Sequence, residues 1–455
     1  MKKLLLLLLV ISFHQIKAQV CFGPDSIYQT VPGSSLESMT TADFNGDGKL
    51  DIATANISNS KVFVFLNTGS GNFGPATSFT LDPNSWPNSI ANADFNKDGF
   101  IDLATANTNT ITNCFSILFG NGAGGFGSPV SFTVNAAPGL IVSEDFDKDG
   151  NSDIVVSDYN SNDISILLGN GTGSFSPPNT YAINSTVDKL LSGDFNGDRK
   201  KDLLITNGGY LSILLNDSAG GFGSPINFSF NYGDPITILD FNGDSILDIA
   251  IADYSNWNSS VNVSFGTGTG SFAGGASILF GSDTPLSISS EDYSGDGKPD
   301  LAVGYNLGAG NISIFIGDGV GSLSYAATLY PNGPTARNII SVDLNSDLAP
   351  DIAAGISNPS YVSVFLNCIT EEVSSQNQQE QPIISPNPTT GQFMIGTNSE
   401  ENQNAKVFDV NGRMVLSQQI NGNANIDATS LDEGIYTLTL MSGATITNKK
   451  LVIVR

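Results

Sequence analysis

The sequence is poor in histidine, basic residues and cysteine, and the first two shortages exclude whole classes of function. His14 is the only histidine among 455 residues, and it lies in a segment that we expect to be removed on export. Without imidazole, Ser-His-Asp, Cys-His and histidine-zinc sites are excluded. Lys and Arg number 18 against 44 Asp and Glu, so the formal net charge is −26. Because such a chain repels phosphate backbones, we expect no nucleic-acid partner.

A hydrophobic run long enough to cross a bilayer is also missing. Residues 4–13 are apolar, follow Lys2 and Lys3 and precede Ala18, which is the charged, apolar and small-residue order of a secretory signal. No run of about 20 apolar residues occurs elsewhere, so no transmembrane segment is expected. We predict a signal peptide over residues 1–18 and a mature protein that is secreted or held at the outer cell surface.

Glycine and short apolar runs dominate the remaining sequence. The chain has 49 Gly and only 14% charged residues, and runs of Val, Ile, Phe and Thr alternate with clusters of Gly, Asn and Asp. This alternation is typical of many short strands joined by turns. We predict an all-β fold, with an apolar content of 40% that is sufficient for real cores.

A nine-residue acidic segment occurs seven times and sets the period of the sequence. The first copy reads DFNGDGKLD, and the copies begin 46 to 52 residues apart at Asp43, Asp94, Asp145, Asp194, Asp240, Asp292 and Asp343. Each copy has one apolar run before it and two after it, then a Gly-rich turn and a fourth run, which makes four strands per repeat. Four strands in about 50 residues is the size of one propeller blade. Seven repeats predict a seven-bladed β-propeller.

The Gly-rich turns identify the family that the repeats resemble. They read GNFGPA from Gly71, GGFGSP from Gly124, GSFSPP from Gly173, GGFGSP from Gly220 and GSFAGG from Gly270, whereas GSLSYA from Gly321 departs from the pattern. The sequence is similar to the FG-GAP or VCBS repeats of integrin α-chain propellers and of many exported bacterial proteins. The resemblance covers roughly residues 20–368 and implies a propeller over residues 19–369. It also implies that the acidic segments join the first and second strands of each blade on the lower face.

Each acidic segment has the donor pattern of a calcium loop. Positions 1, 3, 5 and 9 carry side-chain oxygens and position 7 can offer its backbone carbonyl, as in the first nine residues of an EF-hand loop. We predict calcium as a structural cofactor. The alternative is that the segments are acidic turns that bind no ion. The seventh copy is the doubtful one, because Leu348 replaces the Gly that permits a sharp turn at position 6.

The predicted calcium ligands are Asp43, Asn45, Asp47, Lys49 and Asp51; Asp94, Asn96, Asp98, Phe100 and Asp102; Asp145, Asp147, Asp149, Asn151 and Asp153; Asp194, Asn196, Asp198, Lys200 and Asp202; Asp240, Asn242, Asp244, Ile246 and Asp248; Asp292, Ser294, Asp296, Lys298 and Asp300; and Asp343, Asn345, Asp347 and Asp351.

The phase of the repeats predicts how the ring closes. The mature chain begins with the end of a repeat, CFGPDSIYQTV, and the seventh repeat stops after its third strand at VSVFLNC. The N-terminal strand should therefore complete the seventh blade. Aligned with the first repeat, Cys368 falls at the place of Thr68 and Cys21 at that of Asn72, across one turn. We predict a Cys21–Cys368 disulfide, with two unpaired thiols as the alternative, and a buried, inert Cys114.

If the acidic segments lie on the lower face, the connections between second and third strands and between fourth and first strands lie on the upper face. This upper face is the predicted ligand face. Its loops are rich in Asn and contain both tryptophans of the chain, Trp86 and Trp257. Amide groups and aromatic faces suit a glycan, although Asn and Gly are also ordinary turn formers. We regard these two residues as a weak signal for a glycan or extracellular protein ligand.

The last part of the chain has a different character. Residues 370–382 are polar and read as a linker, and residues 383–455 contain several strands of a small Ig-like sandwich. They resemble the C-terminal sorting domain of the type IX secretion system of Bacteroidetes, with an ordinary accessory β-domain as the alternative. The resemblance implies the type IX secretion machinery as partner and removal of the domain or its exchange for a surface anchor. It rests on Pro386, Asn387, Pro388 and Gly391; Asp409, Gly412 and Arg413; Gly434 and Tyr436; and Lys449 and Lys450.

These observations favour a recognition or adhesion module over an enzyme. The runner-up is a propeller-based polysaccharide lyase or hydrolase, because two carboxylates alone can hydrolyse a glycosidic bond. Asp158, Asp163 and Asp253, near predicted upper loops, are the acids to examine. A purely structural surface component is a third possibility.

Overall fold

The computed structural model describes most of the chain after residue 19. The described residues are 20–30, 34–109, 114–158, 160–183, 185–207, 209–217, 219–229, 235–255, 258–281, 284–306, 310–333, 335–357, 359–368, 383–385, 387, 389–396, 402–409, 413–421, 423–442 and 445–454. The predicted signal peptide and linker, Trp257, Pro386, Pro388 and Gly412 lie outside them. Among the described residues, no helix is long and apolar enough to cross a membrane. The chain divides into two compact units, Met1–Thr370 and Glu371–Arg455.

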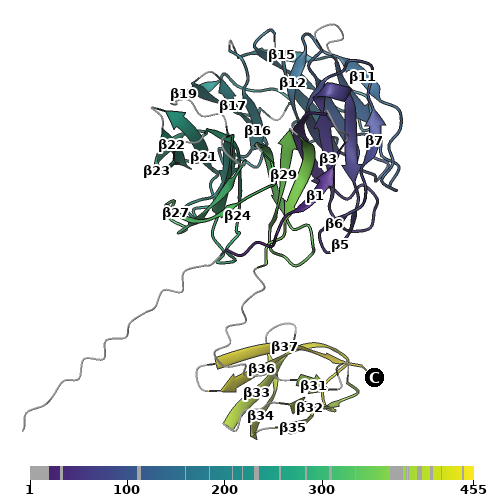
Figure 1. The fold of residues 1–455 in the computed structure, drawn as a ribbon. Helices are drawn as coiled ribbons and strands as arrows, with labels where there is room; N and C mark the ends of the chain where they lie inside the picture. Colours follow the sequence, from purple (N-terminus) through teal and green to yellow (C-terminus); the bar gives the residue numbers. More distant parts are fainter. Residues whose placement is uncertain are drawn as a thin grey trace, which may run out of the picture. The chain divides into compact units, whose positions relative to one another are not determined.

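The first unit contains seven antiparallel four-stranded sheets, which we call blades 1 to 7 (Figure 1). Blades 1 to 4, each from first to fourth strand, are β2 (Leu36–Ala42), β3 (Asp51–Asn56), β4 (Lys61–Phe65) and β7 (Thr77–Thr80); β8 (Pro87–Ala93), β9 (Asp102–Asn107), β10 (Cys114–Leu118) and β11 (Val130–Thr133); β12 (Pro138–Glu144), β13 (Asp153–Asp158), β14 (Asp163–Leu167) and β15 (Asn179–Ala182); and β16 (Lys189–Gly193), β17 (Asp202–Asn207), β18 (Tyr210–Leu214) and β19 (Ile226–Ser229).

Blades 5 to 7 continue the same order. They are β20 (Ile236–Leu239), β21 (Asp248–Ser255), β22 (Asn258–Gly266) and β23 (Phe272–Gly281); β24 (Pro285–Glu291), β25 (Asp300–Tyr305), β26 (Ile312–Gly317) and β27 (Leu323–Leu329); and β28 (Ala336–Val342), β29 (Asp351–Ser357), β30 (Ser360–Phe365) and β1 (Ser26–Gln29). Blade 1 also holds a 3-10 turn, η1 (Ile57–Asn59), and the short pair β5 (Asn67–Gly69) and β6 (Asn72–Phe73). Strand β28 lies against β2, so the last blade meets the first.

Aromatic rings join neighbouring blades. The side chain at position 2 of each acidic loop is at most 2% exposed in all seven copies. In five copies it is an aromatic ring that packs on the Phe of the Gly-rich turn of the next blade, with centroids 5.6 Å apart for Phe44 and Phe126 and 5.8 Å apart for Phe95 and Phe175. In the fifth loop Phe241 shares a core with Leu323, and in the seventh Leu344 shares one with Phe73. The Phe of the FG turn is therefore an inter-blade core residue, which explains why it recurs with the acidic loop.

The ring closes as the phase of the repeats predicts. Strand β1 pairs antiparallel with β30, from Ser26 opposite Val364 to Gln29 opposite Tyr361, so the N-terminal segment is the fourth strand of blade 7. The Cys21–Cys368 disulfide is present, with its Cα atoms 5.1 Å apart. The predicted disulfide is confirmed.

The second unit is a two-sheet sandwich. One sheet contains β31 (Ile383–Ser385), β32 (Gln392–Gly396) and β35 (Ala424–Asp427), and the other β34 (Met414–Asn421), β33 (Asn402–Phe408), β36 (Gly434–Ser442) and β37 (Thr445–Ile453). Both sheets contribute to one core, with Phe393 and Ile426 from the first and Val407, Leu438 and Leu451 from the second. The specific Ig-like topology stays a prediction.

The disulfide should stabilise the propeller against unfolding. It spans 347 residues, and a closed loop of that length removes chain entropy worth about 5 kcal/mol from the unfolded state. We expect Cys21→Ser/Cys368→Ser to lower the urea midpoint of the mature protein by a corresponding amount. Without reductant, the denatured wild type should react with a thiol reagent only at Cys114, the buried free cysteine. Three reactive thiols per chain would contradict the bridge.

Candidate metal centres and ligand face

The acidic loops each connect the first and second strands of a blade, and their carboxylates first bind their own backbone. In the first loop, Asp43 Oδ1 accepts a hydrogen bond from Gly46 N at 2.7 Å and Asp43 Oδ2 accepts one from Gly48 N at 2.7 Å. Both glycines have left-handed backbone, with φ of 73° and 81°. Asn45 Oδ1 accepts from Asp47 N at 3.0 Å. The loop is thus folded by Asx-type bonds from positions 1 and 3.

The aspartate at position 9 is buried in every loop and holds the blade together. Asp51 is 0% exposed; its Oδ2 accepts from Phe44 N at 2.9 Å and its Oδ1 from Asn67 N, in the Gly-rich turn, at 2.7 Å. Each of the other copies likewise accepts one amide from the loop and one from the turn. Burial raises the pKa of Asp51 to about 6, against the opposing effect of these bonds. Position 9 therefore has a structural role that the sequence did not indicate.

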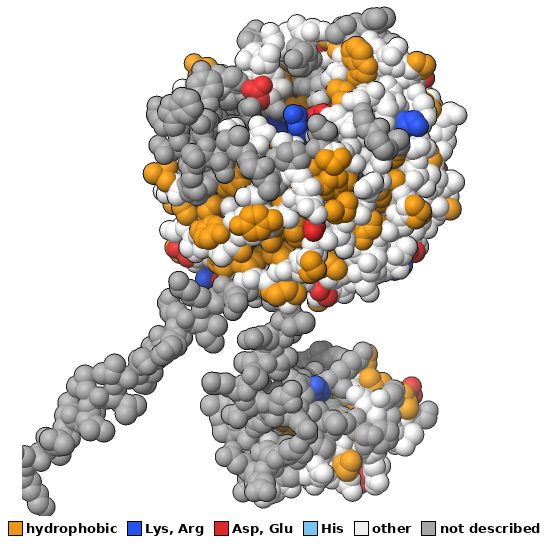
Figure 2. Space-filling model, viewed as in Figure 1, with side chains coloured by type: hydrophobic (Ala, Val, Ile, Leu, Met, Phe, Trp, Pro, Cys, Tyr) orange, Lys and Arg blue, Asp and Glu red, His pale blue; other side chains and the backbone are white. Residues whose placement is uncertain are grey.

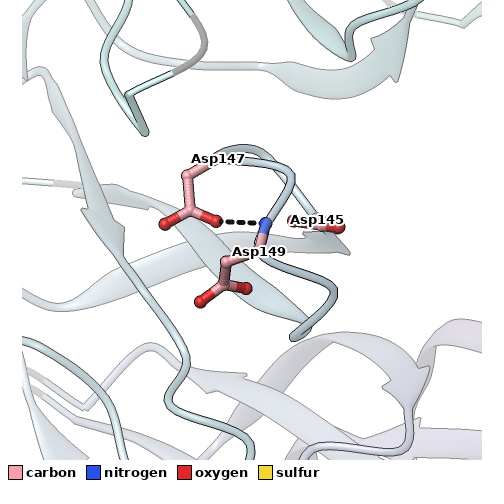
Figure 3. A group of neighbouring side chains, drawn as sticks. All are labelled: Asp145, Asp147 and Asp149. Carbon is pink, nitrogen blue, oxygen red and sulfur yellow. Dashed lines mark hydrogen bonds between the residues drawn. The ribbon is translucent and has the colours of Figure 1, made fainter.

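The third loop brings three carboxylates together (Figure 3). Single oxygens of Asp145, Asp147 and Asp149 lie within 4.8 Å of one another. Asp145 Oδ1 is buried and has no hydrogen-bond partner among the described residues, whereas its Oδ2 accepts from Gly150 N at 2.9 Å. Three carboxylates close together, one of which has an oxygen without a hydrogen-bond partner, suit a calcium ion. The donor set of this loop therefore fits the predicted metal.

In other loops a side chain of the same loop contacts the position-5 carboxylate, either as a charged lysine or as an asparagine amide. In the first, fourth and sixth loops the position-7 lysine does so: the Nζ–carboxylate distances are 2.7 Å for Lys49–Asp47, 2.9 Å for Lys200–Asp198 and 3.5 Å for Lys298–Asp296. These lysines were predicted only as sources of a backbone carbonyl. A metal ion in these loops competes with the ammonium group of the lysine for the carboxylate, although exposed ion pairs of this kind are weak.

In three further loops an asparagine side chain forms a hydrogen bond to the position-5 carboxylate. The position-3 amide donates to the position-5 carboxylate, for example from Asn96 Nδ2 to Asp98 Oδ2 at 2.9 Å. The same bond recurs in the fifth and seventh loops. The third loop has a similar bond, from Asn151 Nδ2 at position 7 to Asp149 Oδ2 at 2.6 Å. It differs from the other six in carrying an acid, Asp147, at position 3, so it offers the largest set of acids.

Trp86 stands on the opposite face of the propeller, in the connection that leads to β8. Its side chain is 46% exposed and its backbone is left-handed, with φ of 54°. Thr108, which follows the second strand of the same blade, donates to the Trp86 carbonyl from its N at 3.1 Å and from its Oγ1 at 3.0 Å. A bulky residue in this region is strained, and the two bonds hold it there.

Buried polar atoms without a partner gather on this upper face. Five of them lie at or beside the hairpin between the second and third strands of blades 1, 3, 4, 6 and 7. They are Asn59 Oδ1, Asp158 Oδ1, Thr206 Oγ1, Asn311 Oδ1 and Tyr361 OH. Within the described part of the propeller, Asp145 is the one such atom in an acidic loop. Sequence analysis missed this set as a whole; of its members it had singled out Asp158 alone, as an acid near a predicted upper loop.

A separate apolar patch lies on the wall of the propeller, over β27 and the strands beside it (Figure 2). Its most exposed members are Leu279 at 73%, Tyr330 at 65% and Tyr325 at 59%. Leu279 and Tyr325 belong to the fourth strands β23 and β27, whereas Tyr330 follows β27 in the same kind of connection as Trp86. Exposed aromatic residues are thus not confined to the predicted ligand face.

The signature residues of the C-terminal unit shape its turns. Asn387 Oδ1 accepts from Val452 N at 2.9 Å, which ties the start of the unit to its last strand. Asp409 accepts from Arg413 N at 2.9 Å and from Arg413 Nε at 3.2 Å, and Tyr436 donates from its hydroxyl to the Asp432 carbonyl at 2.9 Å. These contacts give Asn387, Asp409, Arg413 and Tyr436 structural roles within the unit.

Comparisons with known families agree with both resemblances. The family of FG-GAP-like repeats matches residues 43–105, 194–251, 240–303 and 292–354, and the secretion system C-terminal sorting domain matches residues 384–454. No curated protein matches the sequence.

Solved structures with a similar fold are propellers at low identity. BBS1N, solved in complex with ARL6DN, has a TM-score of 0.53 at 12% identity and covers 76% of this chain and 98% of its own. An Agrocybe aegerita lectin that recognises non-reducing terminal N-acetylglucosamine gives 0.49 at 20% identity, covering 74% and 86%. The Dos1 propeller gives 0.47 at 12%, covering 73% and 77%. These likenesses concern the fold alone.

The recurring loops and turns, the closed set of blades and the C-terminal signature lead to one assignment. The chain is an FG-GAP-like repeat β-propeller with a C-terminal sorting domain of the type IX secretion system, which directs it to the cell surface or the extracellular space.

Proposed function

We propose that the protein is a calcium-binding recognition or adhesion module whose upper face binds a glycan or an extracellular protein. The observation that carries the proposal is the gathering of buried polar atoms without a partner on that face. An unpaired buried polar atom costs about 1–3 kcal/mol, and native proteins carry few of them. In the free protein, water can supply the missing partners. In the complex, the hydroxyl or amide groups of a ligand that replaces this water supply them.

Trp86 adds an apolar surface to this face. Strained backbone persists where the surrounding structure holds it, and such positions are enriched at ligand sites. The exposed indole offers a flat, rigid contact for a sugar ring or an apolar side chain at a low entropic cost. A binding surface that joins an aromatic platform to polar pockets suits a glycan best.

The calcium ions are structural in this proposal. Asp145, Asp147 and Asp149 hold the best-supported ion, which neutralises three acids that otherwise repel one another. The acidic loop lies between one blade and the Gly-rich turn of the next. An ion there stiffens the boundary between two blades and takes no part in a reaction.

A polysaccharide-degrading activity is the second candidate, and one observation favours it. Burial raises the pKa of Asp158 to about 6, and the charge of Asp163 adds to the rise. A carboxylic acid held near that value can act as a general acid. Asp158 is however only 1% exposed, so a small charged group can approach its carboxylate more easily than the glycosidic bond of a polymer can. Release of reducing ends or unsaturated sugars by the mature protein, lost in Asp158→Asn, would establish the enzyme instead.

Calcium removal should destabilise the protein. A ligand at 100 times its dissociation constant adds about 2.7 kcal/mol to folding, so a chelator should lower the melting temperature by several degrees. Asp149→Asn, at position 5 of the third loop, should remove the tightest calcium binding event in titration calorimetry. Asp47→Asn is the matched control, because Lys49 already neutralises that carboxylate, and should cost less. An unchanged melting temperature in chelator would refute the metal assignment.

Recognition should depend on Trp86. We expect the mature protein, in calcium, to bind members of a broad glycan and protein array. Trp86→Ala should weaken a bound ligand by about 2 kcal/mol, roughly 30-fold in Kd, as for a central aromatic contact. Tyr325→Ala, which removes an exposed ring from the propeller wall, is the control and should leave binding unchanged. Equal loss in both variants, or none in Trp86→Ala, would move the ligand site off the upper face.

A further inference from the structure

Two aspartates face each other across the upper hairpin of blade 3. Asp158 ends β13, Asp163 begins β14, and the two are direct partners in the antiparallel register. Side chains in such positions lie about 5 Å apart, and like charges there repel. Asp158 is 1% exposed, whereas Asp163 is only partly buried. The pair thus joins a buried carboxylate to a more open one.

The hydrogen bonds of Asp158 leave this pair unsatisfied. Asp158 Oδ2 accepts from Ser165 Oγ at 2.8 Å, and Asp158 Oδ1 is buried without a hydrogen-bond partner. None of the ion pairs formed by described residues includes Asp158 or Asp163. A buried carboxylate normally has charged or hydrogen-bonding partners on both oxygens. The free oxygen and the opposing charge both call for a positive group.

The equivalent positions of neighbouring blades show how the fold otherwise solves this problem. In blade 1 the pair is Asn56 opposite Lys61, an amide facing a cation. In blade 2 the residue is Asn107, whose Nδ2 donates to Ser116 Oγ at 2.8 Å. Ser116 and Ser165 are equivalent, but in blade 3 the serine must donate to an acid that has no proton to give back. Blade 3 therefore lacks both the amide donor of blades 1 and 2 and the lysine of blade 1.

The burial of Asp158 and the charge of Asp163 both raise the pKa of Asp158. The direction agrees with the contacts, because it reports an ionised form without enough stabilising partners. A positive group between the two acids offsets the repulsion from Asp163 and stabilises the buried ionised form of Asp158.

We propose that Asp158 and Asp163 form a binding site for a positively charged group on the upper face. The buried Asp158 Oδ1 and the more open Asp163 carboxylate hold it from two sides. A metal cation and the ammonium group of an amino sugar or lysine side chain share this chemistry. The site deepens the proposed function and rests on it, because Asp158 Oδ1 is one of the unpartnered atoms of the upper face, but it needs neither Trp86 nor the acidic loops.

The test uses the mature protein and its Asp158→Asn and Asp163→Asn variants. The second variant, at the more exposed position, keeps the test valid if the first folds poorly. Asp253→Asn is the matched control, because Asp253 is the buried acid at the same position of blade 5 but lies opposite Ser260. The probes are calcium chloride, glucosamine as an ammonium source, and N-acetylglucosamine as its uncharged counterpart. Readouts are the melting temperature and the number of bound calcium ions by native mass spectrometry.

Without added cation, Asp158→Asn should raise the melting temperature by roughly 2–4 °C, since it removes the repulsion. The two blade 3 variants should lose at least half of the wild-type rise caused by one charged probe, while Asp253→Asn and Trp86→Ala keep it. Loss of the calcium response, with one ion fewer, identifies a metal site, and loss of the glucosamine response identifies an ammonium site. The proposal is overturned if both variants respond as wild type to both charged probes, or if N-acetylglucosamine matches glucosamine.

Discussion

The buried aspartate at the end of each acidic loop is the interaction on which the propeller depends. Asp51 and its six counterparts are fully buried, and each accepts one amide from its own loop and one from the turn that follows the third strand. A carboxylate out of water is tolerable only with such bonds. Because the bonds tie the start of the second strand to the loop and to that turn, one side chain per repeat fixes the lower end of a blade.

The same loop also joins one blade to the next. The amide of Phe44 donates to Asp51, its ring packs on Phe126 and its carbonyl accepts from Gly124 N at 2.9 Å. In the third loop the donor to this carbonyl is an asparagine side chain: Asn216 Nδ2 donates to the Phe146 carbonyl at 2.8 Å. The residue at position 2 of the loop thus binds the buried aspartate of its own blade and also contacts the next blade. This coupling explains why acidic loop and FG turn repeat with a single period.

The period made much of this fold predictable. The four strands of each repeat, the use of residues 26–29 to complete blade 7 and the Cys21–Cys368 bridge follow from counting residues in phase. The sequence could not show that Asp51 turns inward while Asp47 pairs with Lys49, since both occupy ligand positions of one pattern. Nor could it show the unpartnered Asp158 Oδ1, because hydrogen-bond satisfaction depends on neighbours brought close only by the fold.

The two faces of the propeller differ in how completely they satisfy themselves. In the seventh loop Leu348 is 92% exposed with φ of 73°, a costly position for a leucine. It is held there because its amide donates to Asp343 Oδ2 at 2.8 Å, so the loop keeps its shape through its own bonds even where glycine is absent. Among the described residues the acidic loops hold one buried oxygen without a partner, that of Asp145, whereas at the upper hairpins Asp158, Thr206 and Tyr361 are three of five such residues. Preformed loops thus stabilise the lower side of the scaffold, and the unmet hydrogen bonds above are the basis on which we propose a ligand face there.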